Sequence, residues 1–492
     1  MNAFFDEYWR SAGSPYRVPR AMGPIFLAGA FAAELCDVRV YSEQYSGPLQ
    51  DTRLLAWPDM LVLTGLTSSF DRMLHLTAYA KTLNPAVIVV AGGPAVRALP
   101  RRARRFFDHV CLGDIEELMA IAAEEFGAEY AATDMFPRFD LAPKGGMLGY
   151  VESSRYCNFR CSFCSLTAER GRYRIYDLGY IRRQIESTGK QRLIFLDNNF
   201  YGNDRDFFLA RIALLKEMYH KQQIRGWSAL VTGDFFSRPE NLAIVREAGC
   251  EGLFSGIESF DQSTLRTYNK RHNTLLPQVQ QIRGCLESGI VFTYGIMLDP
   301  SSRRLDDLRQ EIEFILSTPE ITLPAYFTFA IPLLGTPYFR DCVAKRMMLP
   351  SVRLHDMDGL TIVMRPLDPI DDVVAFARDI QNLRGYRLKA LRHTAQFLRR
   401  HRGLLSPLQL MTASVSAALI CTQSAASSPL RPRIRRPRRT FHGPTEALDP
   451  LYRPVIRLPV KFRRYFVPTM VSDPSGDLSE DVSDDMQPVD RH

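Results

Sequence analysis

The segment LGYVESSRYCNFRCSFC (residues 148–164) leads from an apolar, strand-like run into three closely spaced cysteines. Cys157, Cys161 and Cys164 form a C-x3-C-x2-C pattern in a polar stretch that directly follows the run Leu148–Ser153. Thiolates are soft ligands that suit iron–sulfur clusters or zinc. The pattern therefore predicts a metal-binding loop at the carboxyl end of a strand.

The number of thiols favours a cluster over zinc. A structural zinc site needs four ligands, typically two C-x2-C pairs, whereas the nearest histidines here, His109 and His220, are each about fifty residues away in the sequence. Three thiolates on a four-iron cluster leave one iron open to a substrate or cofactor. Two alternatives remain: a zinc site completed by a distant fourth ligand, and three buried cysteines that act only as small apolar side chains.

Strand-like and helix-like segments alternate after residue 146, which predicts a mostly parallel sheet. The expected strands are Leu148–Ser153, Arg192–Leu196, Gly226–Val231, Glu251–Gly256, Ile290–Met297 and Ala325–Ala330. The expected helices include Asp206–Tyr219, Leu276–Ser288 and Leu305–Leu316. Six strand–helix units are fewer than the eight of a closed barrel, so we expect a partial (β/α)6 TIM-like barrel over residues 145–345.

Residues 1–135 predict a second α/β domain, with a doubly wound, Rossmann-like fold. Its expected strands are Val38–Tyr41, Met60–Leu63, Ala86–Ala91 and His109–Leu112, and a helix-like run covers Ile25–Leu35. Small or glycine-rich turns follow the strands, at the edge where ligands bind in such sheets. A Pro/Gly-rich stretch at residues 136–146 predicts the linker to the barrel.

Basic residues are concentrated in the C-terminal third. The chain has 62 Lys and Arg against 54 Asp and Glu, a net charge of +8. Residues 384–402 and 431–439 hold seven and six of the basic residues and no acid, and removing these 13 from 62 leaves 49 against 54 acids. We expect a helical extension over residues 346–427 and a largely disordered tail over 428–492, first basic and then acidic.

The chain shows no run of about 20 apolar residues and no secretory signal at its start. The stretch 404–421 is apolar but contains polar breaks, so a buried or surface-lying helix is expected there. Nine cysteines, an odd number, favour a reducing compartment over a disulfide framework. These features predict a cytoplasmic protein, with peripheral contact to a membrane as an added expectation.

With Phe163 before its last cysteine, the cysteine loop resembles that of the radical SAM superfamily. Further segments resemble the same family in the same order: LDNNFYGN (196–203), SGIES (255–259), YNKRHN (268–273) and PLLGTP (332–337). The resemblance implies a 4Fe–4S cluster on Cys157, Cys161 and Cys164, with S-adenosylmethionine (SAM) on the open iron. The residues implied to bind the cofactor are Phe163, Asp197, Asn198, Asn199, Glu258 and Ser259.

The N-terminal domain resembles the cobalamin-binding domain of class B radical SAM enzymes. The resemblance rests on Thr64-Gly65-Leu66, IVVAGGP (88–94) and CLGDIEE (111–117), and implies cobalamin contacts at Thr64, Leu66, Gly92 and Gly93. Two features depart from the family. No first strand is evident before residue 20, and Gln44 stands where some members carry a cobalt-binding histidine.

The resemblance implies a cobalamin-dependent radical SAM enzyme. The expected reaction is C-methylation of an unactivated carbon in a small molecule (a lipid, pigment or natural product) through a 5′-deoxyadenosyl radical. One alternative is an oxidative cyclase or rearrangement enzyme of the same superfamily. Another is a nucleic-acid-binding iron–sulfur protein, which the scarcity of aromatic residues in the basic segments, only Tyr386 and Phe397, disfavours. The expected partners are a small-molecule substrate, a flavodoxin- or ferredoxin-type electron donor and a membrane surface.

Overall fold

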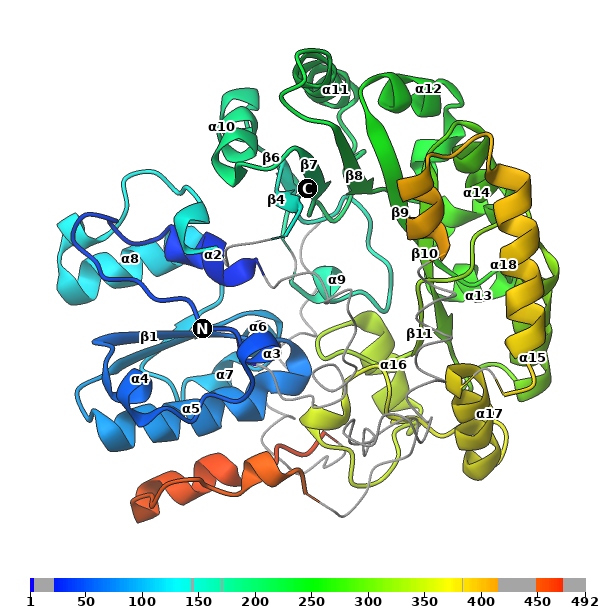
Figure 1. The fold of residues 1–492 in the computed structure, drawn as a ribbon. Coiled ribbons are helices and arrows are strands. Elements are labelled where there is room, and N and C mark those ends of the chain that lie inside the picture. The colour runs from blue at the N-terminus through cyan, green and yellow to red at the C-terminus, as the bar shows by residue number, and fades with distance from the viewer. Residues whose placement is uncertain (4–21, 143–145, 170, 383, 415–447, 472–492) are drawn as a thin grey trace, which may run out of the picture. The chain divides into compact units, whose positions relative to one another are not determined.

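The computed structural model describes residues 1–3, 22–142, 146–169, 171–382, 384–414 and 448–471 (Figure 1). Contacts within the chain divide it into two units. Unit 1 comprises Met1–Pro143, Ile331–Arg365 and Arg435–His492, and unit 2 comprises Lys144–Ala330 and Pro366–Ile434. The predicted basic segment 431–439 and acidic segment 472–492 lie outside the described residues.

Unit 1 contains a three-stranded parallel sheet in the order β1-β2-β3. Its strands are β1 (Met60–Thr64), β2 (Ile88–Gly92) and β3 (His109–Cys111), which confirms three of the four predicted strands. The main helices are α5 (Phe70–Leu83), α6 (Pro94–Ala98) and α8 (Ile115–Phe126). Each helix follows a strand in the chain, so the unit has the strand–helix alternation expected from the sequence.

Two expectations for unit 1 were wrong. Val38–Tyr41 forms no strand, because none of its side chains is buried and the segment therefore has no apolar face to cover. The predicted helix Ile25–Leu35 is only α2 (Gly23–Ala28), which ends at Gly29, where the backbone of Phe136 packs so closely that a Cβ would collide with it. Instead, Ala3 donates its backbone N–H to Thr64 O at 2.8 Å, so the first residues extend the sheet beyond β1.

The C-terminal segment 448–471 belongs to unit 1, although the sequence predicted a largely disordered tail. It forms two short 3₁₀ helices, η7 (Pro450–Tyr452) and η8 (Val460–Phe466), which pack on α5. Tyr452 Oη and Thr469 Oγ1 each donate to the carboxylate of Asp71 at 2.6 Å. The Phe466 ring stacks on His75 at 4.2 Å. Aromatic burial and a shared buried carboxylate thus hold this segment in place.

Unit 2 contains a six-stranded parallel sheet in the order β11-β10-β9-β8-β7-β4, as predicted for a partial barrel. Its strands are β4 (Leu148–Val151), β7 (Arg192–Phe195), β8 (Gly226–Leu230), β9 (Cys250–Glu258), β10 (Val291–Leu298) and β11 (Tyr326–Phe329). Figure 1 shows the sheet curving inside a layer of helices. These helices are α10 (Leu178–Thr188), α11 (Arg205–His220), α12 (Glu240–Glu247), α14 (Gln278–Glu287) and α15 (Leu305–Ser317).

Buried and more exposed residues alternate along several strands of unit 2, although β10 is buried almost throughout. Leu193 and Phe195 of β7 are buried, whereas Ile194 between them is half-buried, and β4 and β9 repeat the pattern. Successive side chains of a strand point to opposite faces, so the fully buried set packs under the helices and the other set lines the concave face. Side chains at the carboxyl ends of the concave face are therefore placed to meet a ligand.

Two further helices, α17 (Ile370–Asn382) and α18 (Arg387–His401), lie within the stretch 346–427 that was expected to be helical. Residues 331–365, which the sequence assigned to the barrel and to the start of this extension, belong to unit 1 instead. Residues 407–414 are also helical, and Gln409 Nε2 donates to Gly289 O at 2.7 Å just before β10 begins. The segment therefore lies against the amino-terminal end of that strand. Within the described residues, no helix combines the length and the apolar character needed to cross a membrane.

Candidate functional site

The three cysteines lie in the loop after β4, at the carboxyl edge of the parallel sheet of unit 2. The loop begins with β5 (Ser154–Arg155), and the cysteines are followed by α9 (Ser165–Glu169). The chain then returns in β6 (Arg174–Ile175), which pairs antiparallel with β5. Cys161 is buried, and Cys157 and Cys164 are half-buried. The sequence therefore placed these residues correctly, in a loop at the mouth of the half barrel.

Residues 268–273, which we call the clasp, come after β9 in the chain and contact the cysteine loop. Ser162 N donates to Tyr268 O at 3.0 Å, and Asn269 Nδ2 donates to Arg160 O at 2.9 Å. The rings of Phe159 and His272 lie 4.0 Å apart. These contacts fix the stretch from Phe159 to Ser162, which has no regular secondary structure of its own.

Lys270 of the clasp carries a buried positive charge beside the cysteines. Its ammonium lies 2.9 Å from Glu258 Oε1 and 5.5 Å from the centre of the Phe163 ring. Gly256 has no side chain at the point where a Cβ would collide with Glu258 Oε1 and contact Lys270 Nζ. The glycine thus leaves the space that this ion pair occupies.

Glu258 is aimed at this position by an irregularity in the sheet. The pairing of β9 with β10 runs from Gly256 opposite Gly295 to Glu258 opposite Ile296, so Ile257 is an extra, bulged residue. Glu258 has a φ of 63°, in the left-handed region that non-glycine residues seldom adopt. Strained backbone and β-bulges cluster at functional sites because both re-aim a side chain.

Burial raises the pKa of all three cysteine thiols, to about 12 for Cys161, while Lys270 opposes the rise. Burial also lowers the pKa of Lys270, but Glu258 and the Cys161 and Cys164 thiols raise it by more, so its net pKa is raised. The four groups therefore sense one another electrostatically. A permanently charged ammonium beside three buried thiols favours their anionic, metal-binding form.

Asp197, which the sequence predicts as a cofactor contact, ties the end of β7 to the start of the cysteine loop. Its carboxylate is fully buried and accepts hydrogen bonds from Ser153 N at 2.7 Å and from Ser154 Oγ at 2.6 Å. Arg211 of α11 is also fully buried. It forms an ion pair with Asp197 at 3.3 Å and donates a hydrogen bond to Ser153 Oγ at 2.8 Å. With its oxygens occupied by protein donors, Asp197 sets the position of the residues that precede the cysteines.

The remaining predicted cofactor residues fall into two groups. Asn198 is exposed at the carboxyl edge, whereas Asn199 is buried and donates to Asn158 Oδ1, inside the cysteine loop, at 2.7 Å. Ser259 is fully buried and donates to Glu311 of α15 at 2.8 Å, so its hydroxyl faces the helix layer. Glu258 and Ser259 are neighbours with different partners: Glu258 pairs with Lys270, whereas Ser259 bonds to the helix layer.

Two aromatic residues on the concave face were not predicted as site residues. The rings of Phe254 on β9 and Tyr326 on β11 stack 6.1 Å apart, and the Tyr326 side chain lies over Gly295, where a Cβ would collide with it. Tyr326 is 43% exposed. Burial and Glu258 raise the pKa of its hydroxyl to about 12 and Lys270 lowers it, so the ring lies within reach of the ion pair. The sequence signal that could have found these two residues is an aromatic side chain within an expected strand.

The donor set suits a cluster. Among the described residues, no three His, Cys, Asp or Glu side chains converge closely enough to hold one metal ion. Three thiolates from one loop are soft ligands of the kind that an iron–sulfur cluster takes, one on each of three irons.

The carboxyl edge of the sheet in unit 1 forms a second candidate site. Gly93 has a φ of 98°, and a Cβ there would lie 3.0 Å from Thr64 Oγ1, so the turns after β1 and β2 pack closely. Leu66 is 62% exposed beside them. Arg97 donates to Leu112 O at 3.0 Å and fixes the turn after β3. Close glycine turns with one exposed apolar side chain fit the approach of a large planar group.

The loop in which some cobalamin-binding proteins carry histidine is short and helical here. It forms α3 (Glu43–Ser46), and Gln44 within it is half-buried. Its neighbour Glu43 is buried and pairs with Arg72 of α5 at 2.7 Å. Gln44 is thus the residue that this chain has at the position of that histidine.

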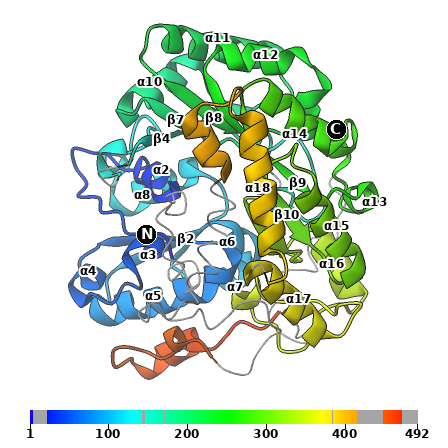
Figure 2. The ribbon, with the colours of Figure 1, turned by 45° about the vertical axis from the view of Figure 1, so that its right-hand side comes forward.

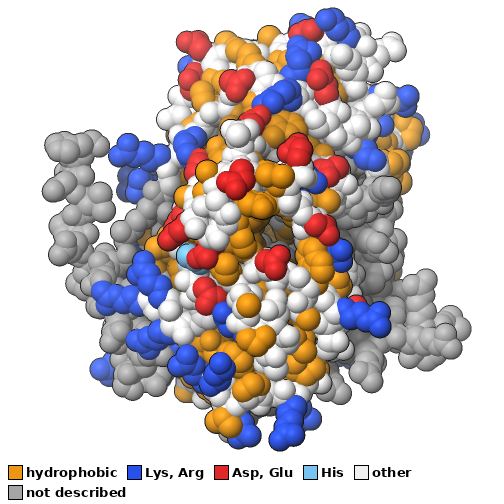
Figure 3. Space-filling model, turned by 90° about the vertical axis from the view of Figure 1, so that its left-hand side faces the viewer, with side chains coloured by type: hydrophobic (Ala, Val, Ile, Leu, Met, Phe, Trp, Pro, Cys, Tyr) orange, Lys and Arg blue, Asp and Glu red, His pale blue; other side chains and the backbone are white. Residues whose placement is uncertain are grey.

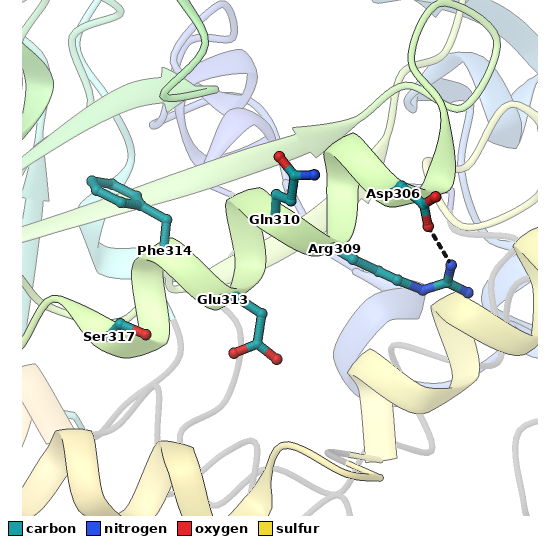
Figure 4. A pocket seen from close by; sticks show the side chains of 6 residues that line it. All are labelled: Asp306, Arg309, Gln310, Glu313, Phe314 and Ser317. Carbon is teal, nitrogen blue, oxygen red and sulfur yellow. Dashed lines mark hydrogen bonds and ion pairs between the residues drawn. The ribbon is translucent and has the colours of Figure 1, made fainter.

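A pocket elsewhere on unit 2 is not part of either site. It has a volume of about 480 Å³ and is lined by residues of α15 alone, which Figure 4 shows. Asp306 and Arg309 at one end form an ion pair at 3.0 Å. No residue of the cysteine loop lines it, so it is not a candidate for the chemistry of the cysteines.

Comparison with known families identifies both domains. Residues 151–314 match the radical SAM superfamily, and residues 27–123 match the B12 binding domain. The chain is similar to the hopanoid C-2 methylase of Rhodopseudomonas palustris, with 25% identity over 75% of this chain and 71% of that protein. It is also similar to the bacteriochlorophyllide d C-8(2)-methyltransferase of Chlorobaculum tepidum, with 24% identity over 58% of this chain and 68% of that protein.

Solved structures share the fold. The cobalamin-dependent SAM radical enzyme OxsB, with aqua-cobalamin and SAM bound, has a TM-score of 0.55 and 15% identity over 83% of this chain and 69% of its own. The radical SAM methyltransferase TsrM from Kitasatospora setae has a TM-score of 0.53 and 16% identity, over 70% and 76%. At these identities the likeness establishes the α/β architecture of this chain.

Proposed function

The chain is a member of the radical SAM superfamily that also carries a B12-binding domain, and from this premise we propose that it methylates an unactivated carbon of an apolar, ring-containing small molecule. It is an enzyme whose cofactors are a 4Fe–4S cluster, SAM and cobalamin. The proposal concerns the residues that hold these groups and the class of substrate. Relatives named as methyltransferases of a hopanoid and of bacteriochlorophyllide support the type of reaction.

The observation that carries the proposal is the clasped cysteine loop beside a buried ammonium. We assign Cys157, Cys161 and Cys164 as the cluster ligands, because they share one loop at the carboxyl edge and lie within the field of Lys270. The bound groups supply the electron-transfer and methyl-transfer chemistry, and the protein supplies binding, orientation and exclusion of water. Three protein ligands leave the fourth position for SAM.

Other residues of unit 2 hold and orient the reactants. The pair of Glu258 and Lys270 presents opposite charges at the mouth of the half barrel, which suits the amino and carboxylate groups of an amino acid such as the methionine part of SAM. Asp197 and Arg211 act as positioning residues, because they touch the strand and loop that carry the cysteines. The exposed Asn198 is the remaining predicted SAM contact.

The concave face suggests the substrate class. Phe254 and Tyr326 form a stacked aromatic wall next to the ion pair. Flat or fused-ring apolar molecules gain binding energy from such a wall, whereas small polar metabolites do not. Together with the two named relatives, this wall supports a polycyclic lipid or pigment as the substrate.

In unit 1, we assign cobalamin binding to the glycine turns at Thr64–Leu66 and Gly92–Gly93. The reaction also needs an electron from outside the chain, so a flavodoxin- or ferredoxin-type donor is the expected partner. Such donors and a reducible cluster both favour a cytoplasmic location.

The decisive experiment is anaerobic purification with cluster reconstitution. We expect about four irons per chain beyond background, bound cobalamin, and SAM cleavage on addition of a reductant. Cys157→Ala, Cys161→Ala and Cys164→Ala should each lose the cluster and SAM cleavage but keep cobalamin, because cobalamin binds to the other domain. Cys250→Ala, on the buried side of β9, is the matched control and should keep both. Retention of the cluster in all three loop variants would refute the ligand assignment.

The reaction type is tested by its products. Methyl transfer consumes one SAM as methyl donor and one as radical source, so S-adenosylhomocysteine and 5′-deoxyadenosine should form in equal amounts with the methylated product. A cyclisation or rearrangement would give 5′-deoxyadenosine without S-adenosylhomocysteine. Equal amounts, with labelled methyl recovered on a carbon atom, support the proposal, and their absence with active SAM cleavage would overturn it.

A further inference from the structure

Helix α18 turns one face toward the half barrel and the opposite face to solvent. Ala390, His393, Phe397 and His401 are buried on the inner face. His393 Nε2 contacts Thr318 O at 3.1 Å, next to the end of α15. Figure 2 shows α18 running along the outside of unit 2 beside α15. The helix is therefore anchored, and its outer face is fixed in orientation.

The outer face mixes leucines with arginines. At 100° per residue, positions 388, 391, 392, 399 and 402 share one side of the helix. This side, which we call the Leu–Arg strip, consists of Leu388, Leu391, Arg392, Arg399 and Arg402, all of them exposed. Leu388 is 80% exposed and Leu391 is 48% exposed. No acidic residue occurs between positions 384 and 402.

Neighbouring acids do not neutralise the strip. Glu313 of α15 pairs with Lys389 at 2.6 Å and Glu320 lies 3.5 Å from Arg400, both on the flank that faces the barrel. In Figure 4, Asp306 of α15 is likewise turned toward Arg309. Among the described residues, none forms an ion pair with Arg392, Arg399 or Arg402. On the face in Figure 3, by contrast, acidic and basic side chains are interspersed.

We propose that the Leu–Arg strip docks unit 2 on an anionic lipid surface. Arginines attract anionic headgroups over about one Debye length, and leucines between them insert into the interface. The strip carries both residue types on one rigid face. Its arginines can therefore contact the headgroups while its leucines are buried in the apolar part of the interface. Docking places an enzyme next to molecules dissolved in the bilayer. The inference does not depend on the proposed methyl transfer.

The residues of the strip do not fit a nucleic acid. Single strands are bound by basic residues together with aromatic platforms. Of the two aromatic residues in the basic segment 384–402, Phe397 is buried against His401, with ring centres 4.4 Å apart, and Tyr386 is half-buried. Exposed leucines contribute nothing to phosphate binding. A second copy of the chain is disfavoured by the like charges that two such strips would bring together.

The test is flotation of the full-length, cluster-loaded protein with vesicles. One set is pure phosphatidylcholine, and the other contains phosphatidylglycerol as well. We expect binding to the second set only, weakening as salt is added. Arg392→Glu/Arg399→Glu should lower the bound fraction at least about tenfold, since each arginine near an anionic surface contributes roughly fivefold. Leu388→Ser/Leu391→Ser should lower it as well, with less change in the salt dependence.

The controls are Arg225→Glu and Leu209→Ser, which change exposed residues elsewhere on unit 2 and should bind as the wild type does. All variants should cleave SAM at the wild-type rate without vesicles, which shows that they are folded and separates this test from that of the proposed function. Equal binding to both vesicle types, or unchanged binding of the strip variants, would overturn the proposal. The proposal would also be overturned if the strip variants lost dimerisation or RNA binding while their vesicle binding was unchanged.

Discussion

The Nζ of Lys270 lies 2.9 Å from Oε1 of Glu258 at the carboxyl edge of the half barrel. Lys270 comes from the clasp and Glu258 from the bulged end of β9, so the pair joins two elements that flank the cysteine loop. Both side chains are largely buried, and the three cysteine thiols lie within their field. The electrostatic environment of the three thiols is thus set by Glu258 and Lys270, which are not among the assigned cluster ligands.

Replacing Lys270 by Met should make the cluster harder to reduce. A nearby positive charge stabilises the more negative, reduced state, so its removal shifts the reduction potential to lower values. An EPR-monitored redox titration of the anaerobically prepared protein measures the shift. Lys270→Arg keeps the charge and should restore most of the potential. A Met variant with wild-type potential and intact iron content would show that the ammonium does not influence the cluster.

Replacing Asp197 by Ala should destabilise unit 2 by about 3–5 kcal/mol, because the buried guanidinium of Arg211 would lose the carboxylate that balances its charge. Urea unfolding followed by circular dichroism measures this change. The double variant Asp197→Ala/Arg211→Met removes both charges and should lose less stability than the two single changes added together. Strict additivity would mean that the pair is not coupled.

Replacing Gly93 by Ala should weaken cobalamin binding without affecting iron. The new Cβ would require a left-handed backbone and would lie 3.0 Å from Thr64 Oγ1, in the cradle of the turns. Gly47→Ala is the matched control, because Gly47 has a φ of 80° but open space around its Cβ position. Cobalamin content, read from the absorption spectrum after gel filtration, should fall only in the Gly93 variant. An equal loss in both variants would point to general strain in unit 1.

His272 should make stability depend on pH. Burial, together with Lys270, lowers its pKa to about 3 in the folded protein, whereas the unfolded chain has a pKa near 6.5. Between these values the unfolded state binds the extra proton, so stability is complete above pH 6.5 and falls as the pH drops toward 3, by up to about 1.4 kcal/mol per unit.

The measurement for His272 is urea unfolding at a series of pH values. His272→Phe keeps an aromatic contact with Phe159 and should show a shallower loss of stability below pH 6.5 than the wild type. His220→Phe, at an exposed position, is the control and should retain the wild-type slope. Parallel curves for the wild type and His272→Phe would exclude this residue as the source.

Regular alternation made the half barrel predictable. All six of its strands were expected from short apolar runs between helix-like segments, because a parallel sheet covered by helices must bury those runs. The cysteine loop was predictable for the same reason, since it directly follows the first of them. Val38–Tyr41 failed because an apolar pattern specifies a strand only where another element covers it.

The remaining errors come from contacts that sequence patterns do not encode. Thr469 bonds to Asp71 across 398 positions, so nothing local distinguishes the segment around it from a disordered tail. The bulge at Ile257 decides which of Glu258 and Ser259 can pair with Lys270, and bulges leave no reliable mark in the sequence. Lys270 was visible as a basic residue in a family-like segment, but its contact with Glu258 depends on how the clasp folds back.

The division of unit 1 among three separate stretches affects how the protein is made. A ribosome releases the sheet of β1–β3 first, then every strand of the half barrel, and only at the end Tyr452 and Thr469. Until then, Asp71 and the ring of His75 on the nascent chain have no C-terminal cover. The sheet of unit 1 therefore completes its packing only once residues 448–471 have been made, after every strand of the half barrel, and a chain truncated before residue 448 would contain all strands of unit 2 but lack part of unit 1.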